Sequence, residues 1–90
     1  MKTNQSRSFE KKVKRFNPRQ KKALDEVINE ILQDPAVGMQ KKGDLKGVFV
    51  YKFKLHDQLY LLAYRVIASG ALELIMIGQH ENYYRELKKM

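Results

Sequence analysis

Apolar positions near the start of the chain recur at the spacing of an α-helix. Ser8 is a suitable N-cap for a short helix at this point. Phe9, Val13 and Phe16 then fall on one side, at spacings of four and three residues, with lysines on the other side. The pattern predicts a short amphipathic helix that begins at Ser8.

A longer helix is predicted after Asn17-Pro18. Asn17 is a good N-cap, Pro18 suits the first turn, and Gln20 stands where a capping-box partner belongs. Asp34-Pro35 ends the helix, because the residue before a proline disfavours helical conformation. Its apolar stripe comprises Ala23, Leu24, Val27, Ile28, Ile31 and Leu32. Such a helical hairpin cannot bury its stripes alone and requires a sheet to pack on.

The hydrophobic period changes to two in the second half of the chain, which is the period of a β-strand. Residues 47–56, 59–67 and 71–77 are the predicted strands, with turns at Asp57-Gln58 and at 68–70. Two consecutive hairpins make this sheet antiparallel. Residues 80–89 predict a short C-terminal helix with basic residues in its last turn.

The two faces of the predicted sheet differ in character. One is a continuous apolar surface of Phe49, Tyr51, Phe53, Tyr60, Leu62, Tyr64, Leu72, Leu74 and Met76. The helical hairpin packs on it, which gives a two-layer α+β domain. The expected first hairpin places Lys54 opposite Leu61. Lys52, Lys54 and Arg65 then share the other face, with Arg65 across from Glu73.

Size and composition favour a single domain over residues 1–90. The hydrophobic fraction of 43% is ordinary for a globular protein, and the longest apolar runs, such as 60–64, are too short to cross a bilayer. The polar N-terminus lacks the apolar stretch of a secretory signal, and the chain has no cysteine. We therefore expect a cytoplasmic protein without a membrane partner.

Positive charge is concentrated at one end of the chain. The formal net charge is +8, and residues 1–22 hold nine Lys and Arg against a single acid, Glu10. The remainder of the chain is balanced. Such a block attracts polyanions, either phosphate backbones or an acidic protein. A solvated helix face produces the same pattern.

The order of these elements resembles the RelE/ParE superfamily of toxins from bacterial type II toxin–antitoxin systems. The similarity extends from about Ser8 to the end of the chain. Its most telling segments are Asp34-Pro35, Gly43–Gly47, Val50–Lys54, Tyr60–Arg65 and Gly78–Arg85. The ending Gly-x-His-x-x-x-Tyr is most similar to the YafQ branch. The resemblance implies an N-terminal helical hairpin on an antiparallel sheet of three to four strands, followed by a short C-terminal helix.

The resemblance also implies an activity, that of a ribosome-dependent messenger RNA endonuclease that inhibits translation. In this reaction a ribose 2′-hydroxyl attacks the adjacent phosphate and expels the 5′-oxygen. The chemistry requires a base, an acid and cations for the developing charge, and it requires no metal or other cofactor. The alternative is a ParE-like inhibitor that binds DNA gyrase without catalysis, and a plain basic RNA-binding domain is a third possibility.

His80 occupies the catalytic position of the family and is the candidate general acid or base, because its unperturbed pKa lies near neutrality. Tyr84 lies one helical turn later, where superfamily members carry an aromatic ring that stacks on the substrate base. Without the motif, the histidine would be interpreted as a loop-holding residue. The tyrosine could equally pack the terminal helix onto the sheet.

The remaining site residues expected from the resemblance are basic. Lys52 and Lys54 match a Lys-x-Lys pair that holds phosphate in RelE, although a solvated strand face gives the same pattern. Arg65 is a candidate for stabilising the phosphorane, or else a cross-strand ion pair with Glu73. His56 is a candidate second proton carrier, or an exposed loop residue. The residues expected to contact substrate or ribosomal RNA are His56, Arg85, Lys11, Lys12, Lys14 and Arg15.

Two departures from the family pattern bear on these expectations. RelE has arginines where this chain has Leu61 and His80, so two cations of its cleft are absent here. The usual first strand of the family would precede Ser8, where no alternating apolar pattern is present, so that strand is expected to be short or missing. The expected partners are an acidic antitoxin that folds over the domain, the ribosome with its message, and operator DNA indirectly through the antitoxin.

Overall fold

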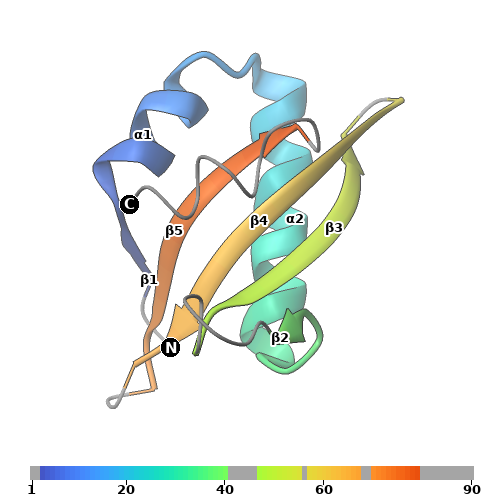
Figure 1. Cartoon of the computed structure of the whole chain (residues 1–90). Helices are drawn as coiled ribbons and strands as arrows, with labels where there is room; N and C mark the ends of the chain where they lie inside the picture. Colours follow the sequence, from blue (N-terminus) through green and yellow to red (C-terminus); the bar gives the residue numbers. More distant parts are fainter. Residues whose placement is uncertain (1–2, 41–46, 56, 68–69, 80–90) are drawn as a thin grey trace.

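The computed structural model describes residues 3–40, 47–55, 57–67 and 70–79. Within these residues, helices α1 (Arg7–Lys14) and α2 (Pro18–Gln33) lie on one side of a five-stranded sheet (Figure 1). The strands are β1 (Thr3–Gln5), β2 (Met39–Gln40), β3 (Phe49–Leu55), β4 (Gln58–Val66) and β5 (Leu72–Gln79), in the spatial order β1-β5-β4-β3-β2. Neither described helix has both the length and the apolar composition that a membrane span requires. The predicted two-layer α+β architecture is confirmed.

Helix α2 begins and ends where the sequence pattern predicts. The Asn17 side chain accepts from the Gln20 backbone N–H at 2.8 Å, and the Gln20 Oε1 accepts from the Asn17 N–H at 2.9 Å. This reciprocal capping box satisfies two of the backbone donors that a helix leaves free at its start. Leu24 and Ile31 are the fully buried residues of its apolar stripe.

Helix α1 begins two residues earlier than expected, because Ser6 and not Ser8 is the N-cap. The Ser6 Oγ accepts from the Phe9 N–H at 3.1 Å and donates to the Ile75 carbonyl oxygen of β5. Ser6 therefore both starts the helix and joins it to the sheet. The sequence pattern placed the cap next to the first apolar residue, but the contact with β5 depends on the tertiary fold.

Replacing Ser6 by alanine should destabilise the domain by about 1–2 kcal/mol, because the first turn of α1 loses its cap and the Ile75 carbonyl loses a donor. Ser8→Ala is the matched control, since Ser8 lies inside the first turn. Urea unfolding of the two variants measures the difference. Equal destabilisation by both would contradict the assignment of the cap.

Strand β1 makes the sheet mixed, which corrects the expectation of an antiparallel sheet of three to four strands. It pairs in parallel with β5, with Thr3 opposite Leu72 and Gln5 opposite Leu74. All three of its residues are polar and exposed, so no alternation of apolar residues marks them as a strand. The other described pairings, β2 with β3, β3 with β4 and β4 with β5, are antiparallel.

The register of the β3–β4 hairpin differs by two residues from the expected one. Lys52 pairs with Leu61, and the pair nearest the turn is Leu55 with Gln58. A two-residue shift leaves every side chain on its predicted face, because the side-chain period of a strand is two. The assignment of Lys52 and Lys54 to the face opposite the helices therefore holds.

The main core lies between the helices and the sheet, as predicted. Its buried members are Phe9, Leu24, Ile31, Leu62, Tyr64, Leu72, Leu74 and Ile77. Half-buried aromatic residues of β3 and β4 pack against them, namely Phe49, Tyr51, Phe53 and Tyr60. Of the predicted core residues, Met76 alone belongs elsewhere.

Met76 faces the opposite side because β5 contains an irregularity. Ala63 pairs with Met76 whereas the next residue, Tyr64, pairs with Leu74, so Ile75 has no partner in the ladder. An extra residue of this kind shifts the alternation of side chains by one. Ile75 and Met76 then join a second buried cluster on the far face, with Val48, Val50, Leu61 and Ala63. Strand β5 also continues to Gln79, two residues beyond the predicted end at Ile77.

Tyr64 joins the end of α2 to the sheet. Its ring is fully buried and stacks on Phe49 at 5.4 Å between centroids. Its hydroxyl accepts from the Gly38 N–H at 3.0 Å and donates to the Pro35 carbonyl oxygen at 2.7 Å. A Cβ at position 38 would lie 2.7 Å from that hydroxyl oxygen, so only glycine fits there.

Replacing Tyr64 by phenylalanine should lower the free energy of unfolding by about 1–3 kcal/mol, because Gly38 and Pro35 lose their partner. Tyr51→Phe removes a more exposed hydroxyl, bonded to Glu30 at 2.8 Å, and should have a smaller effect in the same urea titration. Burial raises the pKa of Tyr64 above the ordinary value of 10.0. The stability that the neutral Tyr64 hydroxyl contributes is fully present below about pH 10 and should be lost as the pH rises through the raised pKa. The loss of stability at high pH should be smaller in Tyr64→Phe.

Candidate functional site

Lys52 and Lys54 lie exposed on the sheet face opposite the helices. They alternate along β3 with Phe53, which faces the helices. Lys52 is in one ladder row with Leu61 and Gly78, so it stands two strands from the end of β5, about 10 Å away. Within the residues that the structure describes, neither amine is paired with a carboxylate. As far as the described residues go, both amines are therefore free to meet an external anion.

The floor of this face is apolar and buried. Val50 and Leu61, the neighbours of Lys52 along and across the strands, are at most 3% exposed. Leu61, where the resemblance implies an arginine, adds no cation to this face. Two lysines at the margin of an apolar floor can hold a phosphate while the sheet fixes their spacing.

Arg65 shares the face of the lysines but does not lie beside them. It stands on β4 six residues beyond Leu59, the partner of Lys54, which corresponds to about 20 Å along the strand. Its guanidinium contacts the Glu73 carboxylate at 3.7 Å, and both side chains are more than 40% exposed. The structure thus contains the cross-strand ion pair that was the alternative, and its geometry gives no support to a role at the phosphorane.

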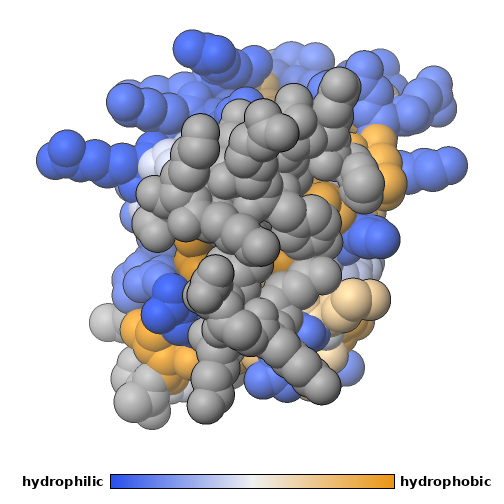
Figure 2. Space-filling model, viewed as in Figure 1, coloured by the Kyte–Doolittle hydropathy of each residue, from blue (hydrophilic) through white to orange (hydrophobic). Residues whose placement is uncertain are grey.

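The basic residues of α1 are all exposed, and they separate into two groups. Lys12 and Arg15 face the carboxyl end of β5, whereas Lys14 lines a different depression beside Glu10 and Lys21. Lys11 lies in a shallow depression that also touches Lys12 and Arg15. Hydrophilic side chains crowd the upper edge of the molecule, over α1 and the start of α2 (Figure 2).

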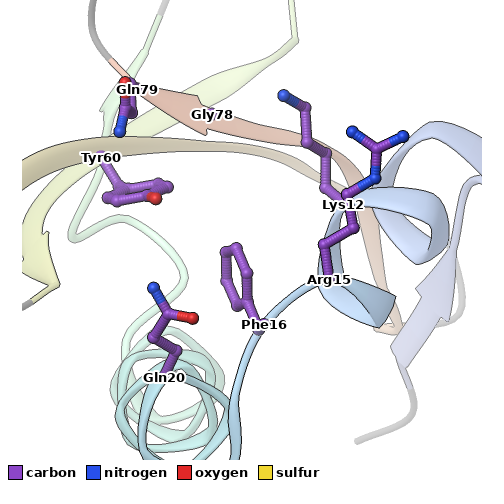
Figure 3. Close-up of a pocket in the computed structure, with 7 residues that line it drawn as sticks. All are labelled: Lys12, Arg15, Phe16, Gln20, Tyr60, Gly78 and Gln79. Atoms are coloured by element: carbon purple, nitrogen blue, oxygen red, sulfur yellow. The ribbon is translucent and has the colours of Figure 1, made fainter.

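A hollow of about 410 Å³ lies where α1, α2, β4 and β5 meet (Figure 3). Its lining residues are Lys12, Arg15, Phe16, Gln20, Tyr60, Gly78 and Gln79. None of these residues is acidic. Lys12 and Arg15 belong to the expected RNA contacts, but Gln20, Tyr60 and Gln79 were not among the predicted site residues. They come from three separate elements, so no sequence spacing connects them.

His56, His80, Tyr84 and Arg85 lie outside the described residues, and their expected roles stay predictions. The described chain ends at Gln79, whose backbone pairs with Tyr60 of β4. Gln79, the residue directly before His80, therefore lies at the rim of the hollow. It follows Gly78, which shares a ladder row with Leu61 and Lys52.

The family comparison covers nearly the whole chain. A family model described as ParE-like toxin of type II bacterial toxin–antitoxin system matches residues 3–88. No curated protein matches closely enough to be counted as a relative.

Solved structures share the fold at low sequence identity. The toxin RelE of E. coli, as a double arginine mutant in the free state, superposes with a TM-score of 0.74 at 17% identity, covering 97% of this chain and 90% of that one. The intact RelBE toxin–antitoxin complex of E. coli gives 0.70 at 21% identity, covering 89% and 96%. The same mutant with a peptide of the antitoxin RelBc gives 0.70 at 19%, covering 96% and 92%.

Proposed function

This chain belongs to the family of ParE-like toxins of type II bacterial toxin–antitoxin systems, and we propose that it stops translation by cutting messenger RNA on the ribosome. The observation that carries the proposal is the pair of exposed amines of Lys52 and Lys54, neither of which has a carboxylate partner among the described residues. Two adjacent cations held by a rigid strand suit a phosphodiester, whose charge grows as the reaction proceeds. The basic surface of α1 supports contact with the phosphates of RNA.

The proposed chemistry is an internal transfer of the phosphate. The 2′-hydroxyl of one nucleotide loses its proton and attacks the neighbouring phosphorus, and the 5′-oxygen of the next nucleotide leaves with a proton. His80 is the proposed proton carrier, with Tyr84 as the stacking residue for a base. Lys52 and Lys54 would stabilise the phosphorane oxygens. Arg65 is left out of this set because of its ion pair and its distance along β4.

An antitoxin is the proposed inhibitor. The related RelE forms a complex with its antitoxin in solved structures. A net charge of +8 on this chain favours an acidic segment that folds on the domain, and operator DNA would then be bound mainly through the antitoxin. The cytoplasm, where ribosomes and operators are found, is the proposed location.

Primer extension on a reporter message after brief induction of the toxin tests the proposal. Cutting on the ribosome predicts discrete new 5′ ends within codons, and these ends should disappear when initiation on the reporter is blocked. A non-catalytic gyrase inhibitor, which the ParE-like family also accommodates, predicts DNA damage with intact message. That second result would overturn the nuclease proposal and leave the family assignment unchanged.

A further inference from the structure

We propose that the hollow between α1, α2 and the end of β5 binds one nucleotide of a single-stranded RNA, with its phosphates on Lys12 and Arg15 and its base on Tyr60 (Figure 3). This site is distinct from the lysine pair on β3. The inference rests on the proposed function in one respect, that the single-stranded RNA is a messenger RNA. The volume of the hollow, about 410 Å³, lies in the range of small-ligand sites.

The charge of the hollow selects an anion. Lys12 and Arg15 are three residues apart at the end of α1, so their side chains share one helix face. Figure 3 shows both cations extending from α1 toward the end of β5. Among the described residues, no acid lines the hollow and neither cation has a carboxylate partner. Adjacent phosphates of one strand would meet both cations at once.

The aromatic wall of the hollow is held in place before any ligand arrives. The Tyr60 ring packs against Phe53 with 6.2 Å between centroids, and the Phe16 ring meets it edge-on at 5.8 Å. Both contacts fix the ring plane, and Tyr60 is only half-buried. A fixed, partly exposed ring is suited to stacking on an unpaired base, and such stacking tolerates any base.

Two amides complete the wall, and each has one end already engaged. The Gln20 Oε1 accepts from the Asn17 N–H, which leaves its Nε2 donors directed toward Tyr60 (Figure 3). The Gln79 Nε2 donates to the Gln58 Oε1, so its own carbonyl oxygen remains an acceptor. One oriented donor and one oriented acceptor can bond the edge of a base, which a site for phosphate alone would not require.

Binding of a 2′-O-methyl RNA hexanucleotide to the full-length toxin tests the proposal, because methylation prevents cutting. Fluorescence anisotropy would compare wild type with Lys12→Gln/Arg15→Gln and with Arg19→Gln/Lys22→Gln. The second pair removes the same charges at the same helical spacing from exposed positions outside the hollow. We expect at least tenfold weaker binding for the first pair and less than twofold for the second. The slope of log Kd against log salt should fall by about 1.4 only in the first pair.

The role of the base requires its own measurement. Hexanucleotides with one abasic position in turn should bind wild type several-fold more weakly at one position, and Tyr60→Leu should abolish that difference. Inorganic phosphate should compete only weakly. If phosphate displaces the RNA fully and every abasic strand binds normally, the hollow holds phosphate alone and the nucleotide proposal is overturned.

Two further outcomes would overturn the proposal. Equal weakening by both charge pairs would mean general attraction by the basic surface. If the binding of an acidic antitoxin peptide requires Lys12 and Arg15 and the binding of RNA does not, the hollow is a protein contact. If RNA binds in the hollow but messages remain uncut in cells, the nuclease proposal is overturned and the nucleotide site is retained.

Discussion

Replacing Lys52 and Lys54 together by alanine is expected to reduce cutting of a reporter message by about two to three orders of magnitude, the usual loss when charge stabilisation at a transition state is removed. Both side chains are exposed and neither belongs to a core cluster, so the fold should be retained. Quantitative primer extension measures the cutting. Restored growth on induction is the corresponding cellular result.

Arg65→Gln is the matched comparison for the lysine variants. It removes a cation from the same sheet face, but one that is paired with Glu73. We expect less than a tenfold loss of cutting from this change. A loss of cutting as large as that of the double lysine variant would show that Arg65 belongs to the catalytic site. Full activity without both lysines would remove the observation on which the nuclease proposal depends.

Replacing His80 by alanine is expected to reduce cutting by about two to four orders of magnitude, because a general acid or base contributes that much to proton transfer. His56 is the only other histidine of the chain and the candidate second proton carrier, so His56→Ala should cause a smaller loss than His80→Ala if His80 is the principal proton carrier. Antitoxin binding by both variants, measured by calorimetry, establishes that they are folded.

The pH dependence distinguishes a proton carrier from a structural histidine. If His80 acts first as a base, cutting by the wild type should fall as the pH drops through about 6.5, where imidazole becomes charged. The residual activity of His80→Ala should lack this fall. An unchanged pH profile in the variant would show that the imidazole moves no proton in the rate-limiting step.

Local signals in the sequence were sufficient for the parts of the fold that local interactions determine. The capping box of Asn17 and Gln20 spans four consecutive residues, and α2 begins where that pattern predicts. The period-two alternation placed Lys52 and Lys54 on the correct face even though the register was shifted by two.

The parts that sequence reasoning missed depend on distant residues. Strand β1 is polar, so only the resemblance indicated a short strand before Ser8, and its parallel pairing with β5 could not be read from its residues. The unpaired Ile75 reverses the direction of Met76, and nothing in an apolar run indicates where an extra residue is placed. Ser6, and not Ser8, is the N-cap of α1, and its hydroxyl also donates to the Ile75 carbonyl oxygen.

The same distinction applies to the candidate site. The lysine pair could be identified because its members alternate within one strand. The hollow could not, because Tyr60 resembles any other core aromatic residue until α1 is placed over the end of β5. Arg65 and Glu73 were correctly aligned by register, and the ion pair between them follows from that alignment.

The pairing of β1 with β5 also constrains how the protein forms during synthesis. The first strand leaves the ribosome long before its neighbour exists, since Thr3 pairs with Leu72. Contacts between such distant positions slow folding and make it a late, cooperative event. A chain that has been synthesised only as far as β4 therefore lacks the β1–β5 pairing, and the polar first strand stays without its neighbour until residues 72–74 have been added.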